Sequence, residues 1–356
     1  MRRIPISVTP TGFHRYPAGT HGLRHALHSC VASRLITCLV SVVGIVVLAQ
    51  TVSAQNLQLM KTLTVPPEAA VHSVAITQKG DYVAAGCQDN QIRLWAFPSG
   101  ELRQSFTFQD QKISGVWFSP DGALLAAGGN RGTVRIWGLP SGKLKAELKT
   151  GADVKALAIS PDHTLVAVAP AEIPAQLWDL DIGRITADLT PKFAGSSAVA
   201  FSSDGQWLAS ADEDTVIRFY DGHTGASRAS AQDLLLETFA IAFSADSKSL
   251  YAGGADKTIS VIDVATGKIS RTFPKQEFVV GGMDASRDGK SLVAAYFDAN
   301  GFSNPAPVLE WDTASGSTQK TIQQPGFRPI GGGFLPDGRL LLASTAEGKL
   351  QIWRIR

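Results

Sequence analysis

A chain of 356 residues has room for two ordinary domains or for one larger repeat fold, so its length leaves both possibilities open. The net charge of +2 depends on the first 54 residues, which contain five arginines and no acidic residue; the remainder has 28 basic and 31 acidic side chains. Because this remainder has no concentrated run of lysine or arginine to neutralise phosphates, we expect no nucleic-acid partner.

Residues 1–54 have the pattern of a signal peptide. Basic residues extend as far as Arg34, an apolar run of 15 residues occupies 35–49, and the small residues Val52-Ser53-Ala54 follow. We expect cleavage after Ala54 and a mature protein outside the cytoplasm, either periplasmic or extracellular. An uncleaved segment would tether the protein to the inner membrane, although 15 apolar residues fall short of the ~20 that span a bilayer comfortably. Membrane contact is therefore expected only through this segment.

Cys87 is the only cysteine of the mature chain, because Cys30 and Cys38 lie in the signal peptide. An internal disulfide is therefore impossible after cleavage. Cys87 ends the strand-like stretch 82–87, and an isolated cysteine in such a stretch is typical of a small buried apolar residue. We predict that its side chain packs in the core.

A short phrase recurs seven times at almost constant spacing. One copy, 118–122, reads Phe-Ser-Pro-Asp-Gly. The copies are centred on Lys79, Asp121, Asp162, Asp204, Asp246, Asp288 and Asp337, with steps of 42, 41, 42, 42, 42 and 49 residues. A second anchor follows 16 residues later at Trp95, Trp137, Trp178, Tyr220, Ile262 and Trp353, with Trp311 displaced by seven further residues. Two phrases that share one period indicate a repeat architecture of seven units.

Each unit divides into four short strands. In the second unit an apolar strand ends in Pro120-Asp121-Gly122, and later strands cover 123–127, 133–137 and 143–148. Pro-Asp-Gly is typical of tight turns, since proline fixes φ at about −65° and glycine permits a positive φ. The last unit stops after its third strand at 350–353, whereas the mature chain begins with an unassigned strand at 57–63. We predict that these two strands pair, which closes the ring and removes two exposed sheet edges.

Four strands per unit of ~42 residues, Ser-Pro-Asp-Gly turns, and third strands ending in Trp178-Asp179, Tyr220-Asp221 and Trp311-Asp312 resemble the WD-repeat family of β-propellers. With seven units, the resemblance implies an all-β, seven-bladed propeller over residues 55–356, with four antiparallel strands in each blade. The family often has a Gly-His pair before the first strand, and this chain has no such pair at any of the seven equivalent positions. The chain therefore resembles a bacterial-type exported member with degenerate repeats.

Several acidic residues fall in turns that the repeat requires. In the family's turn before the third strand, the acids are Asp89, Asp214 and Asp256, and also Glu172 and Glu347. We interpret these as turn residues, together with the acids in 179–181 and 212–214. None of these sets has the Asp-x-Asp-x-Asp-Gly spacing of a calcium loop.

The mature chain has three histidines, His72, His163 and His223, and each lies in a different unit without a second ligand at metal-binding spacing. We therefore expect no metal, no cofactor and no catalytic residue. His163 replaces a turn glycine and His223 lies in another turn, so both are predicted to be solvated. His72 opens an innermost strand and can face a partner.

The innermost strands show two departures from a pattern of small residues. At one axis-facing position the seven units have Ala75, Trp117, Ala158, Ala200, Ala242, Asp284 and Gly333. Small residues are expected where seven strands crowd one axis, so Trp117 and Asp284 are candidates for lining the channel. Under one interpretation Trp117 fills a gap between blades and Asp284 meets solvent; under the other, both contact a ligand.

An insertion of seven residues lengthens a loop of the sixth unit around 298–305. In the resembled family this loop lies on the face that commonly binds partners, which makes Phe302 a candidate anchor. The partner-binding candidates, which lie at the starts of inner strands or on the insertion, are His72, Lys112, Lys155, Glu237, Phe278, Phe302 and Arg328. We expect a monomeric, non-catalytic scaffold that binds a protein or peptide outside the cytoplasm.

Two other functions stay open. One is an enzyme similar to the lactonase and quinoprotein propellers, which place a metal or cofactor over the central channel. Such a site needs several converging acids or histidines, and Asp284 is the single acidic departure at the axis-facing positions. The other is a structural subunit of an envelope complex, which would have a stable partner and no dissociable ligand.

Overall fold

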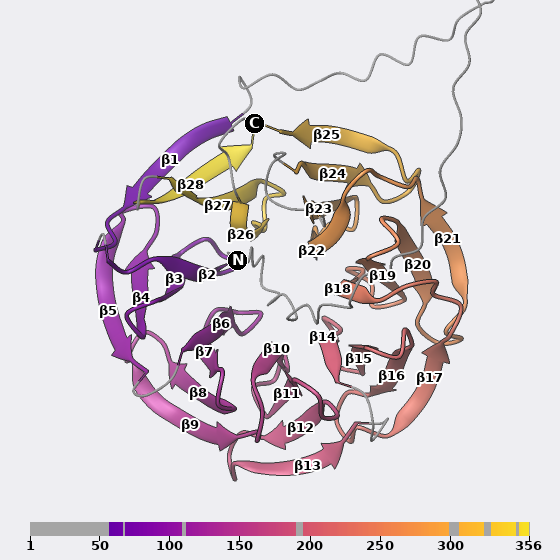
Figure 1. Ribbon diagram of the computed structural model, residues 1–356, viewed down its shortest axis with the longest axis horizontal. Helices are drawn as coiled ribbons and strands as arrows, with labels where there is room; N and C mark the ends of the chain where they lie inside the picture. Colours follow the sequence, from indigo (N-terminus) through magenta and orange to yellow (C-terminus); the bar gives the residue numbers. More distant parts are fainter. Residues whose placement is uncertain are drawn as a thin grey trace, which may run out of the picture. The chain divides into compact units, whose positions relative to one another are not determined.

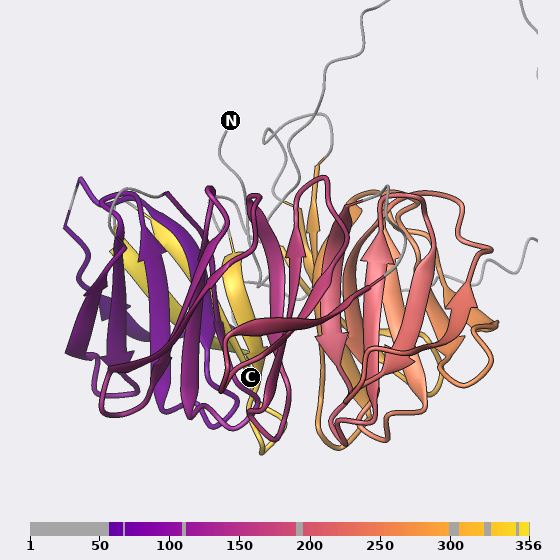
Figure 2. The same ribbon diagram turned by 90° about the horizontal axis from the view of Figure 1, so that it is seen from below.

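The computed structural model describes residues 57–66, 68–108, 112–189, 195–298, 306–323, 329–346 and 349–355. Within these ranges the chain forms seven four-stranded antiparallel sheets and no helix (Figure 1, Figure 2). The sheets surround a central axis as blades, so the predicted all-β, seven-bladed propeller is confirmed. The segment predicted to be a signal peptide and two partner-binding candidates, Phe302 and Arg328, lie outside the described residues.

The first four blades follow one another along the chain, and the strands of each run in order from the axis outward. Blade 1 contains β2 (Val71–Ile76), β3 (Tyr82–Cys87), β4 (Gln91–Ala96) and β5 (Glu101–Thr107). Blade 2 contains β6 (Ile113–Phe118), β7 (Leu124–Gly129), β8 (Thr133–Gly138) and β9 (Lys143–Lys149). Blade 3 contains β10 (Val154–Ile159), β11 (Leu165–Pro170), β12 (Gln176–Asp179) and β13 (Arg184–Asp188). Blade 4 contains β14 (Ser196–Phe201), β15 (Trp207–Asp212), β16 (Ile217–Asp221) and β17 (Ser227–Ala231).

The last three blades have the same order, but blade 7 takes its outer strand from the start of the described chain. Blade 5 contains β18 (Thr238–Phe243), β19 (Ser249–Gly254), β20 (Ile259–Asp263) and β21 (Ile269–Phe273). Blade 6 contains β22 (Val279–Ala285), β23 (Ser291–Phe297), β24 (Val308–Asp312) and β25 (Thr318–Ile322). Blade 7 contains β26 (Pro329–Phe334), β27 (Leu340–Ala346), β28 (Lys349–Ile355) and β1 (Leu57–Leu63).

The pairing of β1 with β28 closes the ring. The two strands are antiparallel, with Leu59 opposite Trp353 and Leu63 opposite Leu350. In Figure 1 the violet β1 lies beside the yellow β28. Leu63 is 1% exposed and packs with Val74 in the hydrophobic cluster between blades 7 and 1. The predicted closure is therefore confirmed.

A serine–aspartate hydrogen bond explains the recurring phrase. In blade 2, Ser119 Oγ donates to Asp121 Oδ1 over 2.7 Å and accepts the backbone N–H of Leu124 over 2.9 Å. Equivalent serine-to-aspartate bonds are made by Ser160, Ser202, Ser244 and Ser286. Gly122 follows with a φ of 78°, a conformation that glycine adopts without a steric penalty. The phrase therefore shapes the turn between the first and second strands of a blade.

His163 stands at the glycine position of this turn in blade 3, with a φ of 62°, as predicted. Its ring is partly exposed and also makes a contact that the sequence did not predict. The ring Nε2 lies 2.8 Å from Asp121 Oδ1 in the turn of blade 2, and the side chain is 26% exposed. Residues one repeat period apart lie side by side in adjacent blades, so a histidine in one turn reaches the acid of the turn before it.

Buried hydrophobic clusters fill the spaces between adjacent blades. The third-strand residues Trp95, Trp137 and Trp178 are buried. Each lies opposite an outer-strand residue that is about half exposed, namely Leu102, Leu144 and Ile185 respectively. These outer side chains shield the tryptophan rings from water. Cys87 is 1% exposed and burial raises the pKa of its thiol to about 11, so its predicted position in the core is confirmed.

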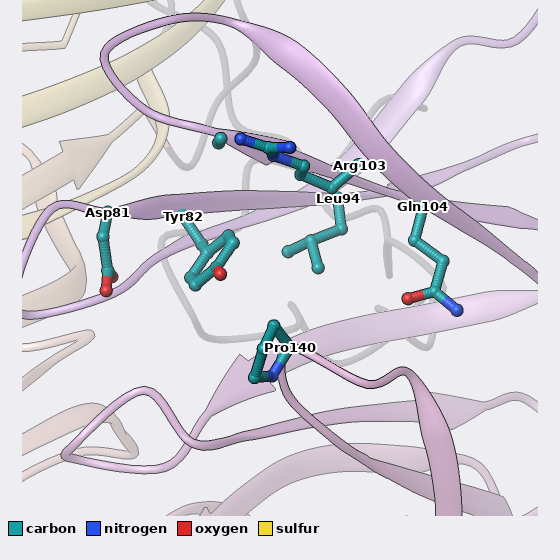
Figure 3. A pocket seen from close by; sticks show the side chains of 7 residues that line it. Asp81, Tyr82, Leu94, Arg103, Gln104 and Pro140 are labelled. Atoms are coloured by element: carbon teal, nitrogen blue, oxygen red, sulfur yellow. The ribbon is translucent and has the colours of Figure 1, made fainter.

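The blades present two sets of connections, which define two faces. We call the top face the one formed by the loops that lead into each inner strand and the loops between second and third strands. Backbone hydrogen bonds join these two sets, as from Asn130 N–H to the Lys112 carbonyl and from Ala171 N–H to the Asp153 carbonyl. The bottom face carries the turns between first and second strands and between third and fourth strands. A pocket of about 320 Å³ opens near the bottom face between blades 1 and 2 (Figure 3).

Candidate functional site

Seven equivalent β-bulges surround the top end of the channel. In every inner strand the register with the second strand shifts by one residue near its start. The residues at the shifts are His72, Ser114, Lys155, Ser197, Phe239, Gly281 and Ile330. A bulge turns its extra side chain away from the regular pleat. We call this set the bulge ring, and two of the sequence candidates, His72 and Lys155, belong to it.

Members of the bulge ring bond to acids on the next blade. Ser114 Oγ donates to Asp153 Oδ1 over 2.5 Å, and Ser197 Oγ donates to Glu237 Oε1 over 3.0 Å. Asp153 and Glu237 occupy equivalent positions, each two residues before the bulge residue of its inner strand, Lys155 and Phe239 respectively. Lys155 Nζ lies 3.5 Å from Asp153 Oδ2, and its side chain is 10% exposed. Asp153 therefore joins blade 2 to blade 3 through Ser114, and Lys155 pairs with it from within blade 3.

The remaining described candidates are spread over different blades. Lys112 is exposed on the loop that enters blade 2, and its backbone N–H donates to Asn130 Oδ1 over 3.0 Å. Phe278 is partly buried and packs against the hydrophobic cluster between blades 5 and 6. His72 is half-buried in blade 1. The structure therefore does not bring Lys112, Phe278 and His72 together into one site.

A loop that sequence reasoning missed presents the most exposed apolar side chains of the top face among the described residues. Residues 232–237 connect β17 to β18 and contain three consecutive leucines. Leu234 packs against the cluster between blades 4 and 5, whereas Leu235 is 83% exposed and Leu236 is 50% exposed. The available signal was a run of three leucines in a connection between repeats, where polar residues are usual.

Acidic residues surround this leucine loop. The acids on the top-face loops of blades 4 and 5 are Glu213, Asp214, Asp233, Glu237 and Asp256. Burial, the largest influence, raises the pKa of Glu237; the hydrogen bond from Ser197 lowers it, and the charge of Glu213 raises it further. Hydrogen bonds from Arg218 lower the pKa of Asp214. Two of these acids, Asp233 and Glu237, belong to the leucine loop itself and flank the leucines in sequence.

Asp212 is a correction to the sequence analysis, which placed it among turn residues. It ends β15, is 1% exposed, and accepts hydrogen bonds from Ser196 over 2.5 Å and Ser210 over 3.1 Å. Arg218 Nη1 lies 2.6 Å from Asp212 Oδ2. Burial raises the pKa of Asp212, and these hydrogen bonds oppose that shift. The group ties three neighbouring strands of blade 4 together.

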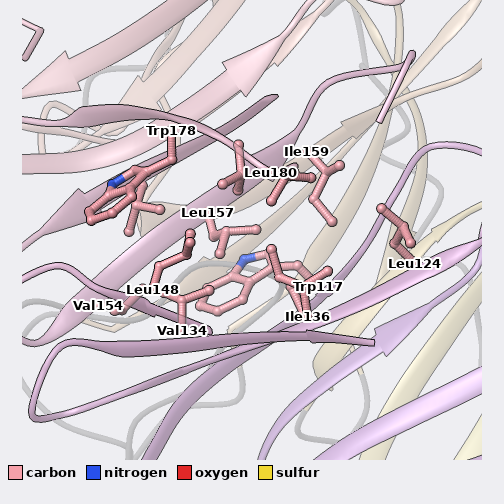
Figure 4. Packing of buried hydrophobic residues seen from close by; sticks show 13 residues of the cluster. Trp117, Leu124, Val134, Ile136, Leu148, Val154, Leu157, Ile159, Trp178 and Leu180 are labelled. Carbon is pink, nitrogen blue, oxygen red and sulfur yellow. The ribbon is translucent and has the colours of Figure 1, made fainter. Parts of the chain in front are cut away.

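Trp117 lies in the core between blades 2 and 3 and does not line the channel. Its side chain is 6% exposed and packs with Val154 and Leu157 of blade 3 (Figure 4). The ring lies against Gly115, where a Cβ would come within 2.3 Å of Trp117 Cη2. The absence of a side chain at position 115 therefore makes room for the ring.

Asp284 links the inner strands of blades 6 and 7. Its Oδ2 accepts the backbone N–H of Phe334 over 2.8 Å, and a Cβ at Gly333 would lie 3.0 Å from the same oxygen. Burial raises the pKa of Asp284 to about 6, while the N–H groups of Phe334 and Ala285 and the charge of Arg287 lower it. Asp284 thus hydrogen-bonds the inner strand of blade 6 to the inner strand of blade 7.

This raised pKa predicts how stability depends on pH. The folded-state value is above the ordinary one, so the favourable contribution of Asp284 is complete below about pH 4 and is lost as pH rises through about 6. Asp284→Asn keeps an oxygen acceptor without titrating. The stability of the variant relative to the wild type is expected to rise by on the order of 2 kcal/mol between pH 4 and pH 7. Urea unfolding across this range measures it, and parallel pH profiles for the two proteins would contradict the assignment.

Within the described ranges, no group of three or more histidine, cysteine or acidic side chains is placed to hold a metal ion. The same ranges contain no helix long and apolar enough to cross a membrane.

Comparison with protein families agrees with this geometry. The family described as WD domain, G-beta repeat matches residues 57–96, 100–138, 191–221 and 238–263. Four WD40 repeats are thereby recognised. Each matched segment includes the first three strands of one blade, namely blades 1, 2, 4 and 5.

Blades 3 and 6 and the strands β26, β27 and β28 of blade 7 fall outside the matched WD40 segments, yet these blades have the same strand order and pairing. Comparison with curated proteins gave no match. WD40 propellers serve many functions on one architecture, so the fold alone does not identify a function. The function has to be inferred from the side chains of the top face.

Proposed function

We propose that the chain is a non-catalytic scaffold, exported from the cytoplasm, that binds a protein or peptide through the top face of its WD40 propeller. The observation that carries this proposal is the exposure of Leu235 and Leu236 on a loop held in place by Leu234. Apolar side chains on a rigid support lose little conformational entropy on binding and can form the centre of an interface. The repeat signature and the signal-peptide pattern of the first 54 residues are the further support.

The ionisable groups near the channel also favour binding over catalysis. Asp153 bonds Ser114 and Lys155, Asp284 accepts a backbone N–H, and Glu237 bonds Ser197. Each of these carboxylates contributes to a contact that joins one blade to the next. A general acid or base has to reach a substrate proton, whereas these carboxylates already serve the packing of the ring.

Affinity capture with the mature protein, residues 55–356, tests the proposal in a cell-envelope extract. The double variant Leu235→Ser/Leu236→Ser is expected to reduce capture of its partner at least about tenfold, the equivalent of ~1.4 kcal/mol. Ile182→Ser is the control, because Ile182 is 65% exposed and lies in a bottom-face turn between β12 and β13. Phe302→Ala tests the insertion in the same assay.

Two outcomes of the capture experiment would contradict the proposal. A partner retained by the leucine variant but lost by the isoleucine variant would move the interface to the bottom face. A bound small molecule that the wild type turns over, without any protein partner, would favour an enzyme over the channel.

A further inference from the structure

The pocket lies near the bottom face between blades 1 and 2, whereas the leucine loop lies on the top face between blades 4 and 5. Its lining residues are Asp81, Tyr82, Leu94, Ala96, Arg103, Gln104 and Pro140. Figure 3 shows Asp81 and Tyr82 on one side of the hollow and Gln104 on the other, with Pro140 of blade 2 opposite them. A volume of about 320 Å³ is at the small end of ligand pockets and suits one side chain or one amino acid.

Blade 4 shows what occupies the corresponding position there. Tyr82 and Trp207 are each the first residue of the second strand of their blade. Arg103 and Arg228 each follow the outer-strand residue that pairs with the third-strand aromatic. In blade 4 the Arg228 guanidinium lies 4.5 Å from the centre of the Trp207 ring. An aromatic ring at this position therefore carries a stacked cation.

A carboxylate holds the cation of blade 4 in place. Asp221, which lies opposite Trp207, forms an ion pair with Arg228, and Arg228 also donates to the Gln206 carbonyl over 3.1 Å. Together these contacts fix the guanidinium over the ring. They fill the space that is open in blade 1.

Blade 1 lacks this carboxylate. The residue opposite Tyr82 is Ala96, which cannot bind a guanidinium. Arg103 instead pairs with Glu101 over 3.1 Å, with both side chains more than half exposed, and such surface pairs are weak. Within the described ranges, no lysine or arginine lies over the Tyr82 ring.

The acid of the pocket is supplied by a different residue. Asp81 Oδ1 accepts a hydrogen bond from Thr77 Oγ1 over 2.6 Å, which fixes the carboxylate beside Tyr82 while leaving the side chain exposed. A ring face beside an oriented carboxylate is the arrangement that recognises a planar cation. Gln104 and Arg103 add donors at the other end.

We propose that this pocket binds a guanidinium group that comes from outside the chain, stacked on Tyr82 and paired with Asp81. Arg103 and Gln104 then donate hydrogen bonds to the carbonyl or carboxylate oxygens next to that group. The guanidinium belongs either to free arginine or to an arginine side chain of a protein, and both have the same chemistry in the pocket. The site is independent of the top face.

Isothermal titration calorimetry of the mature protein with N-acetyl-arginine amide tests this inference. Saturable binding is expected, and the uncharged citrulline counterpart is expected not to bind. Asp81→Asn should weaken binding about tenfold, since it removes the charge and keeps the shape. Tyr82→Phe keeps the ring and should bind normally, whereas Trp207→Ala in blade 4 should leave the affinity unchanged.

The variant Ala96→Asp provides the sharpest test. It restores the carboxylate that blade 4 has, so Arg103 is expected to move over Tyr82, fill the pocket and abolish binding of the probe. Unchanged binding by Ala96→Asp or Asp81→Asn, or equal binding of citrulline, would overturn the proposal. Tighter binding of a single-arginine peptide than of free arginine identifies a protein as the source, and the reverse order identifies the amino acid. Leu235→Ser/Leu236→Ser is expected to leave the affinity for the arginine probe unchanged. The calorimetry therefore tests the bottom-face pocket separately from the proposed top-face interface.

Discussion

Deletion of residues 57–63 is expected to lower the unfolding temperature of the propeller by about 10 °C, because β1 closes the ring. Without β1, the edge of β28 loses its antiparallel partner and the cluster between blades 7 and 1 loses Leu63. Exposed strand edges also pair with other chains, so the deletion is expected to promote aggregation. Differential scanning calorimetry measures the first effect and light scattering the second.

A matched pair of substitutions on β1 separates burial from strand pairing. Leu63→Ala should cost about 3 kcal/mol, since Leu63 is 1% exposed, whereas Leu59→Ala should cost less than about 1 kcal/mol, since Leu59 is 43% exposed. Equal costs for the two substitutions would show that β1 does not dock as described.

The second large effect is expected where Trp117 packs against Gly115. Trp117→Ala should destabilise the propeller by about 3–5 kcal/mol, because it empties a buried position between blades 2 and 3. Gly115→Ala should cost about 1–3 kcal/mol on its own, because its Cβ would lie 2.3 Å from the ring. In the Trp117→Ala background the cost of Gly115→Ala should vanish, since the ring that it meets is gone.

This coupling distinguishes a packing role from a ligand contact. Urea unfolding of the four proteins in the cycle measures it, and the half-exposed Leu144→Ala serves as a control background in which Gly115→Ala keeps its full cost. Additive costs in the Trp117→Ala cycle would contradict the packing described for the ring. Folded Trp117→Ala protein should bind its partner normally.

The backbone of the ring could be predicted from the sequence because its determinants are local. The turn phrase specifies each hairpin through bonds such as Ser119 to Asp121, only two residues apart. The bounds of β1 agree with the predicted 57–63. Its pairing with β28 could be predicted because the last unit lacked a fourth strand and the start of the chain had a strand without a unit. His163 was likewise placed correctly in a turn, since its position follows from the period.

Contacts between blades could not be read from the same period. The burial of Trp117 depends on the missing side chain at Gly115 and on residues of the next blade. Asp212 looked like a turn residue because the strand β15 extends further than the repeat suggested. These outcomes depend on how neighbouring sheets twist against each other, which a single repeat does not specify.

The candidate site was predicted only in part. The top face was the one proposed from the sequence, and the candidate Glu237 ends the leucine loop, but Phe278 is used in packing and Lys155 is paired with Asp153. Leu235 and Leu236 were missed because the candidates were chosen at the starts of inner strands or on the insertion, and in this loop only Glu237 directly precedes an inner strand. Leu235 and Leu236 differ from the partly buried Leu234 in their exposure, which the repeat period does not encode.

Amide hydrogen exchange of the mature protein, with and without its captured partner, tests the central claim most directly. Binding through the top face predicts slowed exchange in the leucine loop 232–237 and in the neighbouring loop 213–216, and unchanged exchange in the bottom-face turns. Protection confined to the bottom-face turns or the outer strands, with none at 232–237, would contradict the account.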